Sequence, residues 1–260
     1  MTQPWPRYTW PGIDAPAEEI LRWGFGEFGQ GIAICTSFQA TGSVIVDMAA
    51  KLVGDRAKVF SIDTGRLHEE TYELIADFRR RYGITVELVT PDSQELSSML
   101  TGHGPNLFYE ASAKRKLCCE IRKVRPLKRR LATLDAWVTG LRRDHSGRRG
   151  LIEKVGVDEE HGGILKLSPL ADWTSDRVFE YAERNGVPLH PLYAKGYPSI
   201  GCQPCTRPVK PGEDSRAGRW WWEDDVDKEC GMHFSADGGL RREFDLLLDE
   251  VLPARRPYLV

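Results

Sequence analysis

The stretch GIAICTSFQATGSV, residues 31–44, decides the fold. Residues 31–38 form a short apolar run bounded by turn-forming residues, which is typical of a buried strand in a parallel sheet. A loop rich in Ser, Thr and Gly follows, and residues 44–53 have helical character. A strand, such a loop and a helix together present backbone N–H groups to an anion at the helix N-terminus. The loop is neither a Walker motif nor GxGxxG, so by itself it is a weak indication of a binding site.

The same alternation of strand and helix continues on both sides of this stretch. Further strands are predicted over residues 57–62, 85–89 and 135–141, with helices over 17–28, 67–82, 91–100 and 113–131. Residues 151–169 predict two short antiparallel strands added at an edge. A helix over 176–185, capped by Thr174 or Ser175 and ended by Gly186, and a last helix over 241–251 complete the pattern.

This order predicts an α/β fold with a Rossmann-like, mostly parallel sheet flanked by helices, and with a mobile C-terminal tail. We expect an N-terminal arm and helix at 1–28, an α/β domain at 29–209 that binds nucleotide and metal, and a C-terminal segment at 210–260. Ligands of such sheets bind at the carboxyl ends of the strands. Ser37, Thr64 and the residues from Gly140 to Arg143 all fall at the carboxyl ends of predicted strands.

Composition excludes several classes of function. The 260 residues carry a formal charge of −2, whereas general nucleic-acid or membrane-surface binders need a basic excess. Basic clusters at 114–116, 122–130 and 142–149 favour a small anionic ligand. Without a secretory signal or an apolar run of about 18 residues, the cytoplasm is the expected location. Cysteines there are more often metal ligands, catalytic groups or core residues than disulfides.

Four of the six cysteines form two close pairs. Cys118 and Cys119 are adjacent, and Cys202 and Cys205 form a C-x-x-C. Two such pairs can make a tetrathiolate site for zinc or for an iron–sulfur cluster. Adjacent cysteines direct both sulfurs to one ion poorly, which favours a cluster. The C-x-x-C alone would also fit a redox pair or structural thiols, and Cys35 is expected to be a small buried hydrophobe.

The remaining cysteine, Cys230, lies in the sequence KECGMH. A thiolate is a strong nucleophile, but an ordinary thiol with a pKa of about 8.5 is mostly protonated at neutral pH. Lys228 and His233 favour the thiolate, whereas Glu229 and the acidic residues before it oppose it. We therefore expect the activating charges to come from elsewhere, when the tail closes over a substrate pocket.

Basic residues can supply the positive charge and the hydrogen-bond donors for an anionic ligand, because guanidinium groups bind phosphate and sulfate bidentately. The candidates are Lys123, Arg142, Arg143, Arg148, Arg149, Arg216 and Arg219. For Arg148 and Arg149 a solvated basic face is an equal alternative. The tryptophans 220–222 fit either the oxyanion site or the core. His145, His161 and His190 are expected to be surface or loop histidines.

These residues together resemble the assimilatory sulfonucleotide reductases, specifically the adenylyl-sulfate (APS) reductases that carry an iron–sulfur cluster. The matching segments are TSFQAT (36–41), DTGRLHEET (63–71), CCEIRKVRPL (118–127), TGLRRDHS (139–146), GCQPCTRPV (201–209), GEDSRAGRWWW (212–222) and KECGMH (228–233). Two positions depart from the family pattern: His145 replaces a common glutamine, and Phe234 replaces a small residue. The combination of CC, CxxC and ECGxH is highly specific.

The resemblance implies an adenine-nucleotide α-hydrolase-like fold, related to the PP-loop pyrophosphatases. It implies a 4Fe-4S cluster on Cys118, Cys119, Cys202 and Cys205, which tunes the site through Lys123 and passes no electrons to substrate. It also implies that Cys230 attacks the sulfur of APS, and that reduced thioredoxin then releases sulfite. Substrate contacts are implied for Ser37, Phe38, Gln39, Thr64, Lys123, Gly140, Arg142, Arg143, Arg148 or Arg149, Arg216, Arg219 and His233.

Three alternatives stay open at this stage. The substrate could be the 3′-phosphorylated nucleotide, PAPS, although enzymes for PAPS generally lack the cluster cysteines. A cluster-bearing PP-loop RNA sulfurtransferase would need an SGGxDS-type loop and a basic surface, and neither is present. A zinc-stapled interaction module is the alternative without catalysis. A homo-oligomer is compatible with the sequence, which does not fix the oligomeric state.

Overall fold

The computed structural model describes residues 10–145, 152–223 and 238–252. The chain forms two compact units, the first made of residues 1–62, 68–88 and 129–195, the second of residues 63–67, 89–128 and 196–260. Each unit is made of several separate stretches of the chain. The three contiguous segments expected from the sequence (1–28, 29–209 and 210–260) are a division of another kind, which remains a prediction. Within the described ranges, no helix has the length and apolar character needed to cross a membrane.

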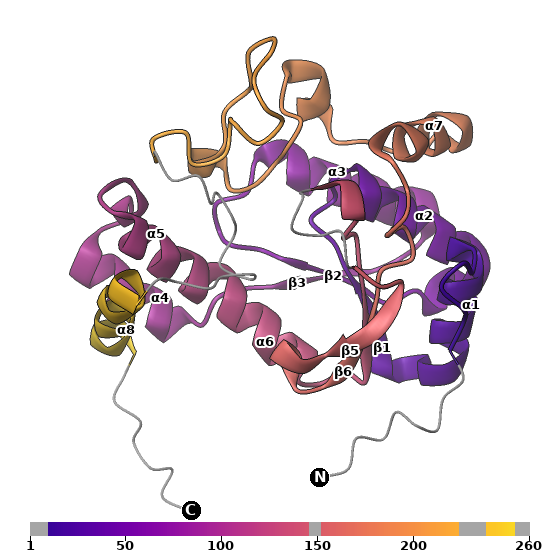
Figure 1. The fold of residues 1–260 in the computed structure, drawn as a ribbon, viewed down its shortest axis with the longest axis horizontal. Helices are drawn as coiled ribbons and strands as arrows, with labels where there is room; N and C mark the ends of the chain where they lie inside the picture. The colour runs from indigo at the N-terminus through magenta and orange to yellow at the C-terminus, as the bar shows by residue number, and fades with distance from the viewer. Residues whose placement is uncertain (1–9, 146–151, 224–237, 253–260) are drawn as a thin grey trace, which may run out of the picture. The chain divides into compact units, whose positions relative to one another are not determined.

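The first unit is built on a six-stranded sheet in the order β3-β2-β1-β4-β6-β5 (Figure 1). The strands are β1 (Ile32–Cys35), β2 (Val59–Ile62), β3 (Val86–Val89), β4 (Ala136–Thr139), β5 (Val155–Asp158) and β6 (Ile164–Leu167). β1 pairs in parallel with β2 and β4, and β4 pairs in parallel with β6. The edge strand β5 pairs with β6 in antiparallel orientation. The predicted mostly parallel sheet and its antiparallel edge are confirmed.

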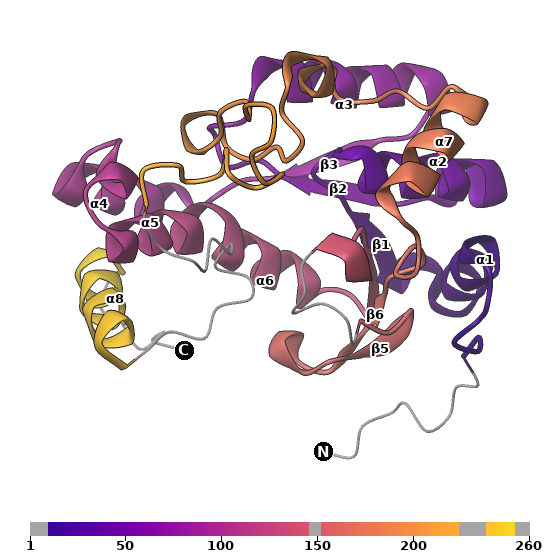
Figure 2. The ribbon, with the colours of Figure 1, turned by 45° about the horizontal axis from the view of Figure 1, so that its top comes forward.

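Four helices belong to the first unit: α1 (Ala17–Phe28), α2 (Ala40–Val53), α3 (Glu69–Tyr82) and α7 (Ser175–Asn185). α2 packs against both α1 and α7, and Figure 2 shows these helices side by side. α7 begins at Thr174, whose hydroxyl accepts a hydrogen bond from the backbone N–H of Arg177, and ends at the left-handed Gly186, as predicted. Position 24 of α1 requires glycine, because the Cβ of any other residue would lie 2.6 Å from the Leu167 side chain.

A buried carboxylate joins three of these helices. Asp47 of α2 is fully buried and accepts hydrogen bonds from the hydroxyls of Tyr82 (2.9 Å) and Tyr181 (2.8 Å). Lys51 completes the cluster with an ion pair of 2.8 Å. Burial, reinforced by the Asp47 carboxylate, raises the pKa of Tyr82 and of Tyr181. Both hydroxyls therefore stay protonated donors at neutral pH.

The second unit contains α4 (Ser93–His103), α5 (Ser112–Cys119), a π-helical turn (Glu120–Val124), the start of α6 (Arg125–Leu131) and α8 (Gly238–Val251). The sequence predicted one helix over 113–131, and the π-helical turn in its middle was not foreseen. Pro126 explains it, because proline has no N–H to donate to the carbonyl of Arg122 and its ring crowds that carbonyl. The N–H of Arg125 donates instead to Glu120, five residues earlier.

The turn between β1 and α2 is tightly built. The Thr36 hydroxyl accepts a hydrogen bond of 2.9 Å from the N–H of Phe38, which adopts the left-handed φ of 55°. Gly42 lies against the same hydroxyl, and a Cβ there would come within 2.3 Å of Thr36 Oγ1. The left-handed Phe38 ends the extended conformation, so β1 is shorter than the predicted run of residues 31–38.

Replacing Gly42 with alanine tests this close approach. The new methyl group would displace the Thr36 side chain, which is buried and too short to move aside. We expect Gly42→Ala to lower the free energy of unfolding by about 1–3 kcal/mol, measured by chemical denaturation. Gly26→Ala in α1 is the control, because nothing lies within 4 Å of its added Cβ. A fully stable Gly42→Ala protein would contradict the tight turn.

The Asp47 cluster gives a second stability prediction. Asp47→Ala removes the acceptor of two tyrosine hydroxyls and the partner of Lys51, so we expect a loss of about 2–4 kcal/mol in unfolding free energy. Asp77→Ala, which breaks the exposed ion pair with Arg80, should change it by no more than about 0.5 kcal/mol. Thermal and urea unfolding of both variants measure the difference. Equal effects of the two substitutions would show that the contacts of Asp47 do not stabilise the packing of the three helices.

Candidate functional site

In the first unit the predicted ligand-binding loops meet at the middle of the sheet. β1 and β4 are parallel neighbours with Cys35 opposite Thr139, so the segments that leave them emerge side by side. The chain continues from β1 to β2 on one side and returns to β4 on the other. Open parallel sheets bind ligands at such a switch point. Residues 36–39 and Gly140 lie there, as the sequence predicted.

The loop after β1 offers mainly backbone donors. The ring of Phe38 is fully buried against Phe78, with ring centroids 5.1 Å apart, so its side chain belongs to the core. The exposed Ser37 hydroxyl accepts from the Gln39 side chain at 3.3 Å. No side chain caps α2, and the N–H groups of Thr41 and Gly42 have no acceptor among the described residues. These amides can bind an anion at the N-terminus of α2.

The two arginines after β4 make contacts within the first unit. Arg142 is only 4% exposed and donates to the Trp173 carbonyl (3.1 Å) and the Ser175 hydroxyl (2.9 Å). It also pairs with Asp144 at 3.2 Å. Nε of Arg143 donates to the Ile152 carbonyl at 2.9 Å. These bonds fix the start of α7 and the loop after β4, a bracing role that the sequence did not reveal.

In the second unit the structure gathers the predicted metal ligands. Cys118 and Cys119 end α5, while Cys202 precedes a 3₁₀ turn (Gln203–Cys205) and Cys205 ends it. Cys118, Cys202 and Cys205 share one apolar cluster. Burial, together with the neighbouring thiols, raises the pKa of Cys118 to about 11 and that of Cys205 to about 12. Without a metal these thiols are therefore protonated at neutral pH.

Polar groups from residues 63–67 approach the cysteine turn. The Thr64 hydroxyl lies 3.2 Å from Cys202 Sγ, and the Gln203 N–H donates to the Arg66 carbonyl at 2.8 Å. The buried Arg122 donates to the Thr64 carbonyl at 2.6 Å, while its Nε has no partner among the described residues. Thr64 was predicted to line a nucleotide pocket, and its contact with a thiol was missed. The two residues are 138 positions apart, so no local pattern signals that contact.

The spacing of the thiols bears on which metal they could hold. Zinc bound to four thiolates at about 2.3 Å brings the sulfurs within roughly 4 Å of one another. Among the described residues, which include all four thiols, no three cysteines have sulfurs within 4.8 Å of one another. A cluster of several irons is larger than one ion and holds its thiolates further apart. As they lie in the described structure, the thiols therefore do not converge on a single ion.

In the same unit, neighbouring side chains hold the Arg219 guanidinium in place. The guanidinium stacks 4.7 Å from the ring of buried Trp220, donates to the Ser199 hydroxyl at 3.3 Å, and leaves Nε without a partner in the described structure. Gly201 makes room for it, because a Cβ there would lie 2.3 Å from Arg219 Nη2. Arg216 and Lys123 are half-buried. Of the three tryptophans, Trp220 belongs to the core, while Trp221 remains 39% exposed.

Several predicted residues lie outside the described residues: Cys230, His233, Arg148 and Arg149. Of the histidines expected at the surface or in loops, His190 is a buried loop residue and His161 is half-buried at the end of a 3₁₀ turn (Glu159–His161). His190 accepts a hydrogen bond from the N–H of Leu192, and the His161 ring bonds Asp158 at 2.9 Å. Asp158, Glu160 and His161 could together approach one ion, a grouping that sequence reasoning missed. Asp158 already accepts from Trp137 at 3.0 Å.

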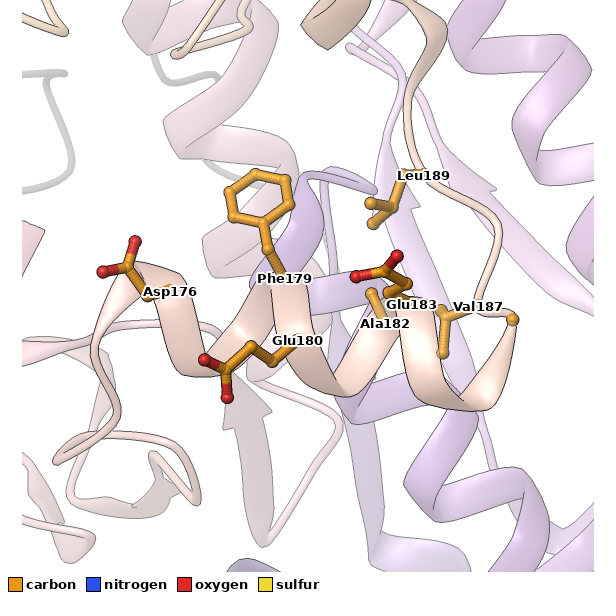
Figure 3. A pocket seen from close by; sticks show the side chains of 8 residues that line it. Asp176, Phe179, Glu180, Ala182, Glu183, Val187 and Leu189 are labelled. Atoms are coloured by element: carbon orange, nitrogen blue, oxygen red, sulfur yellow. The ribbon is translucent and has the colours of Figure 1, made fainter.

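A separate hollow lies along α7 (Figure 3). Its lining residues are Asp176, Phe179, Glu180, Ala182, Glu183, Gly186, Val187 and Leu189. The lining carries three carboxylates and no basic side chain. Negative charges repel an anionic ligand, so this hollow does not suit a sulfate or phosphate group.

Comparison with known proteins agrees with this geometry. Residues 31–208 match the phosphoadenosine phosphosulfate reductase domain family. An adenosine 5′-phosphosulfate reductase from Burkholderia cepacia is 51% identical over 177 residues, which are 68% of this chain and 70% of that protein. One from Pseudomonas aeruginosa (strain LESB58) is 43% identical over 225 residues, 85% of this chain and 83% of that one.

Solved structures support the same assignment. The crystal structure of a phosphoadenylyl-sulfate (PAPS) reductase from Candida auris superposes with a TM-score of 0.64 and 29% identity, covering 75% of this chain and 92% of that one. Yeast FAD synthetase, at 14% identity and a TM-score of 0.52 over 74% of this chain and 66% of that one, shares the fold alone. The resemblance seen in the sequence is thereby confirmed, and the chain belongs to the phosphoadenosine phosphosulfate reductase family.

Proposed function

We propose that this enzyme reduces adenosine 5′-phosphosulfate to sulfite and AMP, as a step of sulfate assimilation that supplies cysteine biosynthesis. One observation carries the choice of substrate: the four paired cysteines lie in one unit, in a chain that is 40–51% identical to several proteins named adenosine 5′-phosphosulfate reductase. A cytoplasmic location fits, since thiols are kept reduced there.

Cys230 is the proposed nucleophile. Its thiolate attacks the sulfur of the sulfate group, the bond from that sulfur to the bridging oxygen breaks, and AMP leaves with the electron pair. The enzyme then carries an S-sulfocysteine. One thiol of reduced thioredoxin attacks Cys230 Sγ and expels sulfite, and its second thiol resolves the mixed disulfide. The dithiol thus supplies both electrons, and Cys230 returns to its starting state.

In this proposal, uncharged residues bind the nucleotide and mainly basic residues bind the phosphosulfate. We assign the nucleotide to Ser37, Phe38, Gln39, Thr64 and Gly140, with the amides at the start of α2 as donors. We assign the phosphosulfate to Lys123, Arg216, Arg219, Arg148 and His233, with Arg142 and Arg143 holding the loop after β4. Fixed cations stabilise the charge that develops on the leaving phosphate and prevent the sulfate from turning away from the thiolate.

The residues present fit a 4Fe-4S cluster held by Cys118, Cys119, Cys202 and Cys205. Two of the thiols are buried and two are half-buried, no three of them converge on one ion, and the Thr64 hydroxyl and the Arg122 guanidinium lie nearby. When bound, the cluster supplies a buried charge that tunes the surrounding electrostatics. Thr64 and Arg122 can hydrogen-bond thiolates, and Lys123 follows Arg122 directly in the π-helical turn.

Replacing Cys230 tests the nucleophile. With ³⁵S-labelled APS and no reductant, we expect the wild type to retain label on the chain and to release one AMP per active site. Cys230→Ser should retain none, because serine is not ionised at neutral pH. Gel electrophoresis without thiols and mass spectrometry measure the label, and Cys35→Ser, in β1, is the matched control. Stable labelling of Cys230→Ser would refute the mechanism.

The same assay decides the substrate. Catalytic efficiency with thioredoxin should be at least tenfold higher for APS than for PAPS. A preference for PAPS would assign the chain instead to the reaction named for the Candida auris structure.

Iron analysis tests the cofactor. Protein purified without oxygen should be brown and contain about four irons and four labile sulfides per chain. Cys202→Ser should lose most of the iron, because it removes one of four ligands, whereas Cys35→Ser should keep it. Because Cys118 and Cys205 must lose protons to bind metal, reconstitution of the cluster should be faster at pH 8.5 than at pH 6.5. A colourless protein with stoichiometric zinc would overturn the cluster.

A further inference from the structure

The N-terminus of α2 is held by a side chain from a distant part of the sequence. The backbone N–H of Ala40, the first residue of α2, donates a hydrogen bond of 2.9 Å to the hydroxyl of Tyr193. The two residues are 153 positions apart and belong to the same unit. Because no side chain next to the helix start caps α2, Tyr193 supplies the acceptor that a capping residue normally provides.

The bond to Tyr193 decides which amides of this loop stay open. Of the first three N–H groups of α2, that of Ala40 is bonded, while those of Thr41 and Gly42 have no acceptor among the described residues. A Cβ on Gly140 would lie 3.4 Å from the nitrogen of Gly42, so glycine at that position keeps space beside this amide. Two adjacent amides beside such a space suit one anionic group.

The short 3₁₀ helix that carries Tyr193 (Pro191–Lys195) is fixed to α3 at its start. The buried His190 accepts a hydrogen bond at Nδ1 from the N–H of Leu192 (3.3 Å), so its Nε2 carries the proton. Nε2 donates that proton to the Thr71 hydroxyl at 3.0 Å. Burial is the main reason that the pKa of His190 falls to about 4, so the ring is neutral at pH 7 and keeps this arrangement.

The end of the 3₁₀ helix and the Tyr193 ring are held as well. Lys195 pairs with Glu70 of α3 at 2.8 Å, and the Tyr193 ring packs edge-on against Phe179 of α7 with ring centroids 5.4 Å apart. Burial raises the pKa of Tyr193 although the charge of Arg142 opposes this, so the hydroxyl stays protonated at neutral pH. Contacts with α3 and α7 therefore set the position of the hydroxyl that α2 meets.

We propose that Tyr193 is a positioning residue for the loop between β1 and α2, to which the nucleotide is assigned. By accepting the N–H of Ala40, the Tyr193 hydroxyl fixes the first turn of α2, so that the two open amides keep one arrangement before a ligand binds. A binding loop that is already ordered loses less conformational freedom on binding, which raises affinity. This inference rests on the proposed binding of the nucleotide at this loop.

Deleting the Tyr193 hydroxyl tests this role. We expect Tyr193→Phe to weaken the binding of AMP about 5–10-fold, measured by isothermal titration calorimetry, and to raise KM for APS by a similar factor. kcat at saturating APS should stay within about twofold of wild type, because contacts made equally in the ground state and the transition state change KM alone. A merely unstable protein would instead lose active sites, which lowers kcat at an unchanged KM.

Tyr181→Phe is the matched control. It removes another tyrosine hydroxyl that bonds α2, but at Asp47, about two turns beyond the start of the helix. Tyr181→Phe should lower the unfolding free energy and yet leave the affinity for AMP within about twofold of wild type. Equal affinities of wild type and Tyr193→Phe, or an equal loss of affinity in the two variants, would overturn the proposal.

Thr71→Val tests whether α3 acts through Tyr193. Valine keeps the shape of threonine but cannot bond His190, so Tyr193 should be held less firmly and AMP should bind about two- to fourfold more weakly. Added to Tyr193→Phe, it should weaken binding by less than about twofold more, because the hydroxyl that it positions is then missing. Fully additive losses would contradict the route through Tyr193.

Amide hydrogen exchange measures the contact without a ligand. In the free wild type the Ala40 amide should be protected, and Tyr193→Phe should speed its exchange at least tenfold, while amides in the middle of α2 change less than about twofold. Unchanged exchange of the Ala40 amide would overturn the inference even in an active enzyme. If the wild type binds no AMP, the proposed nucleotide site fails. If wild type and Tyr193→Phe bind AMP equally, the proposed function stands and only the role of Tyr193 fails.

Discussion

Burial of ionisable groups against α5 is the constraint on which the second unit depends. This helix of eight residues carries Arg115, whose guanidinium is paired with Glu223 and stacked on Trp220, and it ends in Cys118 and Cys119. Each group would be costly to bury alone, since an unpaired charge in a protein interior loses several kcal/mol of hydration. Arg115 and Glu223 are tolerated together because each neutralises the other. Loss of either charge leaves the other buried without its partner.

Burial also separates the roles of the cysteines. It raises the pKa of Cys118 and Cys205, and a protonated thiol is a poor nucleophile. Such thiols become thiolates only when a metal replaces the proton, which makes them durable ligands. A nucleophile needs the opposite setting, with access to substrate and a thiolate at neutral pH. A protein that needs both kinds of thiol has to place them on different segments, as the proposed role of Cys230 requires.

The parts of the fold that local patterns encode could be predicted from the sequence. The apolar runs of β1 and β4, the glycine that ends α7 and the antiparallel edge strands depend on residues close together in the chain. The π-helical turn was missed although Pro126 signals it locally. The contact of Thr64 with Cys202 and the pairing of Arg115 with Glu223 join residues 138 and 108 positions apart. Only the tertiary fold creates such pairs, so no spacing rule reveals them.

The proposed substrate carries charge that backbone amides and guanidinium groups meet in different ways, and the two units offer different groups of this kind. In the first unit the binding loop presents backbone amides, and the Arg142 guanidinium is already bonded to the Trp173 carbonyl, Ser175 and Asp144. Amide dipoles suit a nucleotide, but a sulfate group under attack by an anion needs full positive charges close to it. Arg219 is proposed to supply one such charge, because in the second unit its Nε has no partner in the described structure and its plane is fixed against Trp220. A rigid cation with an unused donor costs little to reorganise when charge moves onto the leaving group, and that is the property the transfer step requires.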